Sequence, residues 1–305
     1  MRRRVPLHLH CVVKGSAAGE RANFGGRYMA EPIIEITDLA VGYSTRQILS
    51  DVNIDIYKGE LIGIIGPNGA GKSTFLKTIR GLLPRLEGSV KFLGKKIEHL
   101  PEKEFARTVA YLQQHVEVGF GYTGKEVVLA GRYPYMSWWQ SETDRDEEIA
   151  MECMEYTGTA ELADRPVSEV SGGQKQRILL AKVLAQQTPI LFLDEPTTGL
   201  DMVYQEEIFR FAQELSRMGK TVLMVVHELN LASKYCDRIL LLGKGKLLAD
   251  GKPKDVFTEE LLSYAYEADV EVAKNANTNS LEITTKINEL SSKKRRDLLK
   301  KICNE

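Results

Sequence analysis

The chain has 305 residues, of which 43% are hydrophobic and 27% charged, and its formal net charge at pH 7 is -1. This composition is ordinary for a globular protein, and the near-zero charge argues against a nucleic-acid-binding protein that depends on a basic surface. No window reaches the ~18 uninterrupted apolar residues of a membrane span. The four cysteines are scattered without metal-ligand spacing, which is typical of reduced cytosolic thiols.

The first 28 residues are basic and irregular, unlike the chain that follows. Their apolar run is broken by His8 and His10, so it is shorter than the ~7 residues that a signal peptide needs. We therefore expect residues 1–28 to be a disordered extension, or to reflect a misassigned start upstream of Met29.

Residues 33–57 are expected to form strands, followed by a turn at 58–60 and a further strand at 61–65. Val52, Ile54 and Ile56 alternate with polar residues, as in a strand with one buried face. Residues 61–65 are apolar apart from one glycine, which is typical of a strand covered on both faces in a parallel sheet. A helix with apolar spacing follows over 75–83, and residues 88–97 return to strand.

The rest of the chain is expected to alternate between strands and helices. Short strands are predicted at 110–112, 190–193, 221–226, 238–242 and 246–248. Helical structure is predicted at 124–158 with an interruption at 131–139, from 171, and at 202–218. Polar residues end several of these strands, as in a parallel α/β sheet that binds its ligand at the carboxyl edge. The block 115–188 interrupts the alternation and is interpreted as an inserted helical subdomain. Residues 271–305, with the basic run 293–296, are expected to be a C-terminal extension.

A glycine-rich segment follows the strand at 61–65 and precedes a helix. It matches the pattern G-x-x-x-x-G-K-[ST] in full. Backbone N–H groups can surround phosphate oxygens only where no side chain intervenes, and the following helix adds its positive end. Lys72 would reach the β- and γ-phosphates and Ser73 would hold Mg²⁺. The predicted nucleotide-binding residues are Tyr43, discussed below, and Gly66, Pro67, Asn68, Gly69, Ala70, Gly71, Lys72, Ser73 and Thr74.

Two adjacent carboxylates end the strand at 190–193. Asp194 can join the Mg²⁺ coordination, and Glu195 can accept a proton from an attacking water. A solvated Asp-Glu turn does not explain the four apolar residues that lead to this pair.

A second candidate anion site lies where a helix begins, because the N–H groups there are bare. It consists of Ser171, Gly172, Gly173 and Gln174.

In this order, the motifs resemble an ABC transporter ATP-binding subunit over about residues 31–270. The segment "SGGQ" resembles the family signature, with Val170 where the family usually has Leu. Asp201 ends a segment that resembles the family's dimer loop. His227 matches the switch histidine, Gln114 rather than Gln113 the glutamine of its loop, and Tyr43 the aromatic that stacks on adenine. The implied fold is α/β: a P-loop NTPase (RecA-like) parallel sheet with an antiparallel β subdomain and an inserted helical subdomain.

The resemblance implies an ATPase with ATP and Mg²⁺ as cofactors. Two copies would pair head to tail, each ATP lying between the phosphate loop of one copy and the Ser171 loop of the other. Glu195, His227 and Gln114 would be the catalytic residues. Ser73, Gln114 and Asp194 would be the metal ligands, and Gln114 would link the metal to the helical insert.

The segment "LAGRYPY" resembles ATPases of importers for iron–siderophore complexes, haem and cobalamin. Tyr133, Tyr135, Trp138 and Trp139 form an aromatic cluster there, and it is expected near a membrane permease. The implied protein is peripheral, on the cytoplasmic face of the cell membrane. It would serve a substrate-binding protein indirectly and bind no nucleic acid. The alternatives are an ABC exporter subunit, a non-transport ATPase such as one for iron–sulfur assembly, and a regulatory module without ATPase activity. The cargo itself stays open.

Overall fold

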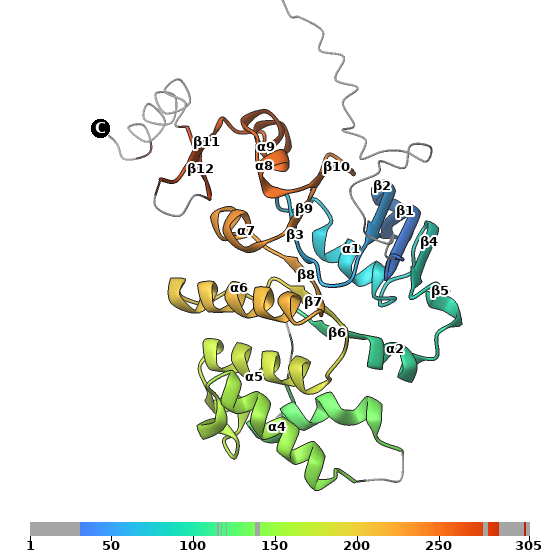
Figure 1. Ribbon diagram of the computed structural model, residues 1–305, viewed down its shortest axis with the longest axis vertical. Coiled ribbons are helices and arrows are strands. Elements are labelled where there is room, and N and C mark those ends of the chain that lie inside the picture. Colours follow the sequence, from blue (N-terminus) through green and yellow to red (C-terminus); the bar gives the residue numbers. More distant parts are fainter. Residues whose placement is uncertain are drawn as a thin grey trace, which may run out of the picture.

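The computed structural model of the protein describes residues 31–114, 116, 118–119, 121–137, 141–276, 280–286 and 302. Within these residues the strands form one sheet of six strands, one of four and one of two. Figure 1 shows the four-stranded sheet at the right and residues 124–185 as a separate group of helices at the bottom. The predicted extension 1–28 lies outside the described residues.

The six-stranded sheet has the order β10-β9-β3-β8-β7-β6, and its neighbours are parallel except for the antiparallel edge pair β9 and β10. Every residue of β3, β7 and β8 is buried. The predicted parallel sheet is therefore confirmed. The strands are β3 (Leu61–Ile65), β6 (Val109–Leu112), β7 (Ile190–Asp194), β8 (Thr221–Val225), β9 (Arg238–Gly243) and β10 (Lys246–Gly251).

The central strands fill two hydrophobic cores, one on each face of the sheet. On β3, Ile62 and Ile64 enter the core that contains α1 (Lys72–Ile79), whereas Leu61 and Ile65 enter the core that contains α6 (Met202–Arg217). Side chains alternate between the two faces of a strand, so an unbroken apolar run is what both cores require.

The four-stranded antiparallel sheet has the order β2-β1-β4-β5 and covers the core that contains α1. On β2, Val52, Ile54 and Ile56 are buried while the polar residues between them are exposed. The predicted alternation and the antiparallel subdomain are confirmed. The strands are β1 (Ile34–Tyr43), β2 (Arg46–Ile56), β4 (Glu87–Phe92) and β5 (Lys95–Lys96).

Residues 97–185 are mostly helical, and three of their helices, α3, α4 and α5, begin with a capping box. Thr123 caps α3 and exchanges hydrogen bonds with Glu126, and Thr143 does the same with Asp146 at α4. Such caps are encoded locally, because donor and acceptor are three residues apart. The helices are η1 (Ile97–His99), α2 (Glu102–Thr108), α3 (Gly124–Leu129), η2 (Ala130–Tyr135), α4 (Asp144–Tyr156), η3 (Ala160–Leu162), η4 (Val167–Glu169) and α5 (Gly172–Ala185).

A β-hairpin near the C-terminal end packs on α7 (Leu229–Tyr235). Its second strand is held by two side chains of α7: Asn230 Oδ1 accepts from Ile283 N at 2.7 Å and Ser233 Oγ accepts from Leu281 N at 3.0 Å. The sequence interpretation did not anticipate these strands, because their partner on α7 lies about 50 residues away. The elements here are α8 (Pro253–Val256), α9 (Glu259–Tyr266), β11 (Val270–Lys274) and β12 (Leu281–Thr285).

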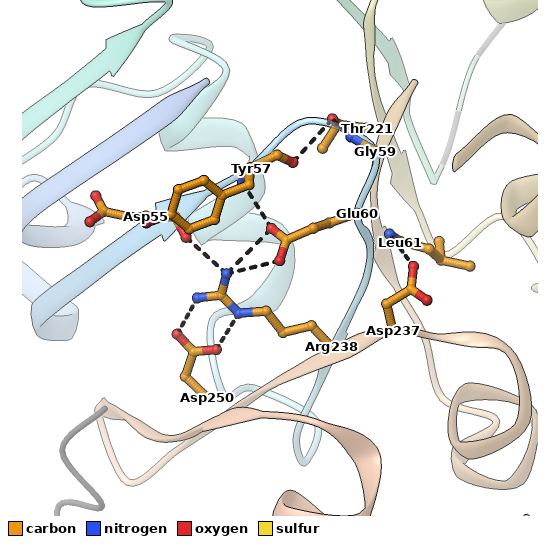
Figure 2. A network of polar contacts seen from close by, with 9 residues as sticks. All are labelled: Asp55, Tyr57, Gly59, Glu60, Leu61, Thr221, Asp237, Arg238 and Asp250. Atoms are coloured by element: carbon orange, nitrogen blue, oxygen red, sulfur yellow. Dashed lines mark hydrogen bonds and ion pairs between the residues drawn. The ribbon is translucent and has the colours of Figure 1, made fainter. Parts of the chain in front are cut away.

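Arg238, at the start of β9, joins the turn before β3 to the edge strand β10 (Figure 2). Its guanidinium makes two bonds of 2.6 Å to the Asp250 carboxylate, and Nη1 lies 3.3 Å from the nearer oxygen of Glu60 and 2.8 Å from the Asp55 carbonyl. The pair with Asp250 has the bidentate geometry that gives strong charge-assisted hydrogen bonds.

No helix in the described part of the chain combines the length and apolarity needed to span a membrane.

Replacing Arg238 with Met is expected to lower the free energy of unfolding by about 2–3 kcal/mol, because two carboxylates would lose their shared cation. This is below the ~3–5 kcal/mol of a fully buried pair, since the side chains of Arg238, Glu60 and Asp250 are 18%, 24% and 24% exposed. Urea denaturation measures the change. The control is Arg217→Met, an exposed arginine on α6, expected within about 0.5 kcal/mol of the unchanged protein. Equal losses for both variants would contradict the prediction.

Candidate nucleotide-binding site

The loop 66–71 joins β3 to α1 through conformations that favour glycine. Gly66 has a φ of 148° and Gly71 a φ of 91°. A Cβ atom on Gly66 would lie 2.1 Å from the Leu242 carbonyl oxygen, and one on Gly71 would lie 2.5 Å from Cγ2 of Ile48. Neither position has room for a side chain, so the loop presents bare backbone before the N-terminus of α1. This is the geometry that a phosphate-binding loop needs.

Lys72, the first residue of α1, folds back over this loop. Its Nζ donates to the carbonyl oxygens of Gly66 at 2.8 Å and Pro67 at 3.1 Å. Burial lowers the pKa of Lys72, while the Glu195 and Asp194 carboxylates oppose this shift. The ammonium group is thus held beside the loop, where it can contact the terminal phosphates of a nucleotide.

Ser73 and Asp194 meet at the carboxyl edge of the central sheet. Ser73 Oγ donates to Asp194 Oδ1 at 2.7 Å, and the Tyr111 hydroxyl donates to Oδ2 at 2.9 Å. Asp194 is fully buried. Burial raises its pKa, and the two hydroxyl donors oppose that shift. The carboxylate is therefore hydrogen-bonded on both oxygens.

This pair of oxygens suits Mg²⁺, a hard cation that proteins often bind through one or two side-chain oxygens, completed by waters and phosphates. Among the described residues there is no group of three or more His, Cys, Asp or Glu side chains that could hold a metal ion. The donor set therefore fits a metal that shares its coordination with a nucleotide rather than a metal held by protein alone.

Glu195 lies next to this pair and is surrounded by donors. Gln114 Nε2 lies 2.5 Å from Oε2, Thr198 Oγ1 donates to Oε2 at 3.1 Å, and His227 Nε2 lies 2.9 Å from Oε1. Burial raises the pKa of Glu195, but bonds from His227 and Thr198 and the charge of Lys72 outweigh burial and lower it overall. The carboxylate is therefore ionised at neutral pH and fixed in orientation.

The backbone at Glu195 is strained. Its φ of 51° is in the left-handed region, which glycine usually occupies. Such a residue costs about 1–3 kcal/mol and persists only where its surroundings impose it. Here the Glu195 N–H donates to the Val225 carbonyl at 3.2 Å, on the neighbouring strand β8. That bond and the three side-chain donors hold the carboxylate in place.

The predicted second anion site lies at the N-terminus of α5. Ser171 and Gln174 form a capping box, in which the Ser171 N–H donates to Gln174 Oε1 at 3.0 Å and Ser171 Oγ accepts from the Gln174 N–H at 3.3 Å. A Cβ atom on Gly172 would meet nothing within 4 Å. The space beside Gly172, at the N-terminus of α5, is therefore open.

Two further residues that are predicted to belong to the site, Asp201 and Tyr43, lie at the surface. Asp201 caps α6, where Oδ1 accepts from Val203 N at 3.0 Å and Tyr204 N at 3.1 Å, so its own side chain has a structural function. Met202 and Val203 beside it are 77% and 61% exposed. Tyr43, at the end of β1, is 49% exposed, which leaves its ring accessible to a flat ligand.

Sequence reasoning missed Tyr111 and Thr198 as members of the site. Tyr111 is predicted only as a strand residue, and Thr198 only as part of the segment 197–201, which resembles the family's dimer loop. The strand register gives the signal for the first: Tyr111 lies opposite Phe192 in the parallel pair β6 and β7, two residues before Asp194. That register depends on tertiary pairing and could not be read from the sequence.

The segment 131–135 has an interior and an exterior side. Arg132 is buried, pairs with Asp146 at 2.8 Å and donates to the Ala185 carbonyl at 2.8 Å, so it joins η2 to α4 and α5. Tyr133 is 57% exposed, and the Tyr135 hydroxyl donates to the Gln186 carbonyl at 2.9 Å. Trp138 and Trp139 of the predicted aromatic cluster lie outside the described residues.

Fold and site together define a P-loop nucleotide-hydrolysing protein. The parallel sheet brings Lys72 and Ser73 from α1, Gln114 from the end of β6, and Asp194 and Glu195 from the end of β7 to one edge, with His227 after β8.

A family model described as "ABC transporter" matches residues 49–198. The iron(3+)-hydroxamate import ATP-binding protein FhuC of Bacillus subtilis is 40% identical over 79% of this chain and 90% of its own length. The hemin import ATP-binding protein HmuV of Streptomyces coelicolor is 40% identical over 80% and 86%. The ferric enterobactin transport ATP-binding protein FepC of Escherichia coli is 39% identical over 75% and 84%.

Two solved structures share the fold. An inward-facing ABC transporter assigned to the metal-chelate type has a TM-score of 0.74 at 23% identity, over 85% of this chain and all of that chain. A dimeric ATP-binding cassette bound to ADP and Pi has a TM-score of 0.65 at 28% identity, over 72% and 98%. The chain belongs to the family of ABC transporter ATP-binding subunits. It is an ATPase coupled to transport, and such subunits pair with one another and associate with membrane permeases.

Proposed function

We propose that this ATPase powers the import of an iron chelate, a ferric siderophore or haem, through a separate membrane permease. The observation that carries the proposal is the similarity, over most of the chain, to proteins whose names describe the import of ferric hydroxamate, hemin and ferric enterobactin. This similarity favours import over export, and a permease over a soluble iron–sulfur scaffold.

Each ATP lies between two copies of the chain. The phosphate loop 66–74 of one copy holds the phosphates, and the segment 171–174 of the second copy closes over them. The open space at the N-terminus of α5 supports this arrangement, because backbone N–H groups there can donate hydrogen bonds to an anion. Tyr43 stacks on the adenine, and Asp201 with its exposed neighbours Met202 and Val203 lies at the contact between the copies.

Ser73, Asp194 and Gln114 hold Mg²⁺ together with the phosphates. When bound, the metal neutralises charge that develops on the transferred phosphoryl group. The Asp194 carboxylate is already aligned, since Ser73 and Tyr111 each bind one of its oxygens. On nucleotide binding, Lys72 exchanges the loop carbonyls that it contacts for phosphate oxygens. Its buried ammonium group then has charged partners in place of neutral ones, which gives stronger hydrogen bonds.

Glu195 accepts the proton of the attacking water. Its Oε2 already carries bonds from Gln114 and Thr198, whereas Oε1 has the single contact with His227. Each carboxylate oxygen has two acceptor sites, so Oε1 keeps one free for water. His227 contacts the γ-phosphate. Gln114 joins this centre to the segment before the helical block, so nucleotide state is transmitted to that block.

The helical block contacts the permease, with the exposed Tyr133 on its surface. The protein is peripheral on the cytoplasmic face of the membrane, and a substrate-binding protein delivers the cargo to the permease from the other side. This arrangement is supported by the names of the relatives, which describe ATP-binding proteins of import systems.

The test is uptake by cells that carry Glu195→Gln in the native gene, supplied with labelled ferric siderophore, haem or cobalamin. We expect one iron-chelate uptake to disappear while the other activities persist, because the variant should bind ATP without hydrolysing it. The matched control is Glu271→Gln, an exposed glutamate on β11, which should leave uptake unchanged. If all three uptake activities persisted while the purified unchanged protein hydrolysed ATP, the importer proposal would be wrong.

A further inference from the structure

The end of β6 supplies one donor to each of the two adjacent carboxylates at the end of β7. Tyr111, inside β6, donates to Asp194 Oδ2 at 2.9 Å. Gln114, three residues further on, donates to Glu195 Oε2 at 2.5 Å. The two strands are parallel with Tyr111 opposite Phe192, so a long side chain is needed to reach two residues along β7. Tyrosine has that length and ends in a donor.

The two oxygens of Asp194 differ in the kind of donor they meet. Oδ1 is bound by Ser73, whose hydroxyl can itself turn to a metal ion, whereas Oδ2 is bound by a phenol that is a neutral donor at pH 7. If Oδ1 and Ser73 Oγ both coordinate Mg²⁺, Tyr111 keeps the carboxylate plane fixed through the other oxygen. Asp194 is 0% exposed, so no solvent molecule at the surface can replace that bond.

We propose that Tyr111 is a positioning residue for the magnesium site, which acts by fixing the orientation of the Asp194 carboxylate. The inference rests on the proposed function, in which Asp194 and Ser73 hold Mg²⁺. Residues that orient metal ligands typically contribute 10–100-fold to metal affinity. Because Gln114 follows two residues after β6 ends, this strand and the residues directly after it orient both Asp194 and Glu195.

The experiment compares Mn²⁺ binding by the full-length protein and by Tyr111→Phe, with a non-hydrolysable ATP analogue bound. Free Mn²⁺ is measured by its electron paramagnetic resonance signal. We expect the dissociation constant for Mn²⁺ to rise about tenfold in the variant, at the lower end of the range for such residues. The affinity for the nucleotide in EDTA should not change, since Tyr111 bonds to Asp194 and not to the phosphate loop.

Two further variants separate positioning from structural damage. Tyr156→Phe is the matched control: it removes a hydroxyl that donates to Glu214 on α6, and it should bind Mn²⁺ like the unchanged protein. In an Asp194→Asn background, Tyr111→Phe should have no additional effect on Mn²⁺ affinity, because the carboxylate it orients is gone.

Three results would overturn the inference. The first is an unchanged Mn²⁺ affinity in Tyr111→Phe. The second is an equal loss of nucleotide affinity in EDTA, which would indicate general damage to the site. The third is a full Tyr111 effect without the Asp194 carboxylate. Failure of the unchanged protein to bind Mn²⁺ with nucleotide would instead overturn the magnesium site on which the inference rests. A negative uptake experiment would leave the Mn²⁺ result standing, so the two failures are distinguishable.

Discussion

Replacing Glu195 with Gln is expected to slow ATP hydrolysis by at least about 100-fold, the lower end of the ~10²–10⁴-fold contribution of a general base. An amide has nearly the shape of the carboxylate but cannot accept the proton of the attacking water. ATP binding should persist, because Lys72 and the loop around it are unchanged. Release of phosphate measures the first effect, and equilibrium binding of a fluorescent ATP analogue measures the second.

The control for this experiment is Glu271→Gln on the exposed face of β11, which should hydrolyse ATP at the unchanged rate. Hydrolysis by Glu195→Gln within a factor of about three of the control would show that another group takes the proton, since a general base contributes far more. Loss of nucleotide binding in Glu195→Gln would contradict the assignment in a different way, by showing that the carboxylate holds the site together.

The second large effect is on ATP hydrolysis at the site that two copies of the chain are proposed to form together. Lys72→Ala and Ser171→Arg should each abolish hydrolysis alone, the first by removing the phosphate contact and the second by placing a bulky cation in the open N-terminus of α5. In a head-to-tail pair, mixing the two variants creates dimers in which one site contains both changes and the other contains neither. Activity should therefore return, to roughly a quarter of the unchanged rate if pairing is random.

The measurement is phosphate release after the two purified variants are mixed with ATP. Mixing two preparations of the same variant is the control, and it should restore nothing. If Lys72 and Ser171 acted on one ATP within a single chain, every dimer would have a defect in both of its sites. The mixture would then stay inactive, and the proposed arrangement of the two copies would be wrong.

Much of the fold could be predicted because its signals are local. Apart from Gly63, the strand β3 is apolar since both of its faces are covered, and β2 alternates since one face is exposed. The capping boxes of α3, α4 and α5 place donor and acceptor three residues apart. The hairpin of β11 and β12 was not anticipated, because the side chains of Asn230 and Ser233 that hold it come from a distant helix.

Part of the candidate site could also be predicted because its signals are local in the sequence. Gly66 and Gly71 are required by their own backbone conformations and close contacts, so the phosphate loop could be recognised from its glycines. The role of Glu195 was predicted from its place after a buried strand and that of His227 from a resemblance to a family, and the structure adds that the two side chains lie 2.9 Å apart. It also adds that Arg132, in the importer-like segment, is an interior residue that joins three helices.

The kind of chemistry could be identified from local sequence: a bare glycine loop before a helix, followed by a lysine and a hydroxyl, and two carboxylates after a buried strand. These features depend on backbone conformations and helix ends that neighbouring residues decide. Which donor faces which carboxylate oxygen depends instead on tertiary contacts. Tyr111 reaches Asp194 across 83 residues and Gln114 reaches Glu195 across 81, because β6 pairs with β7 in one particular register. Pairing between distant strands is set by the packing of the whole sheet, and no local pattern encodes it.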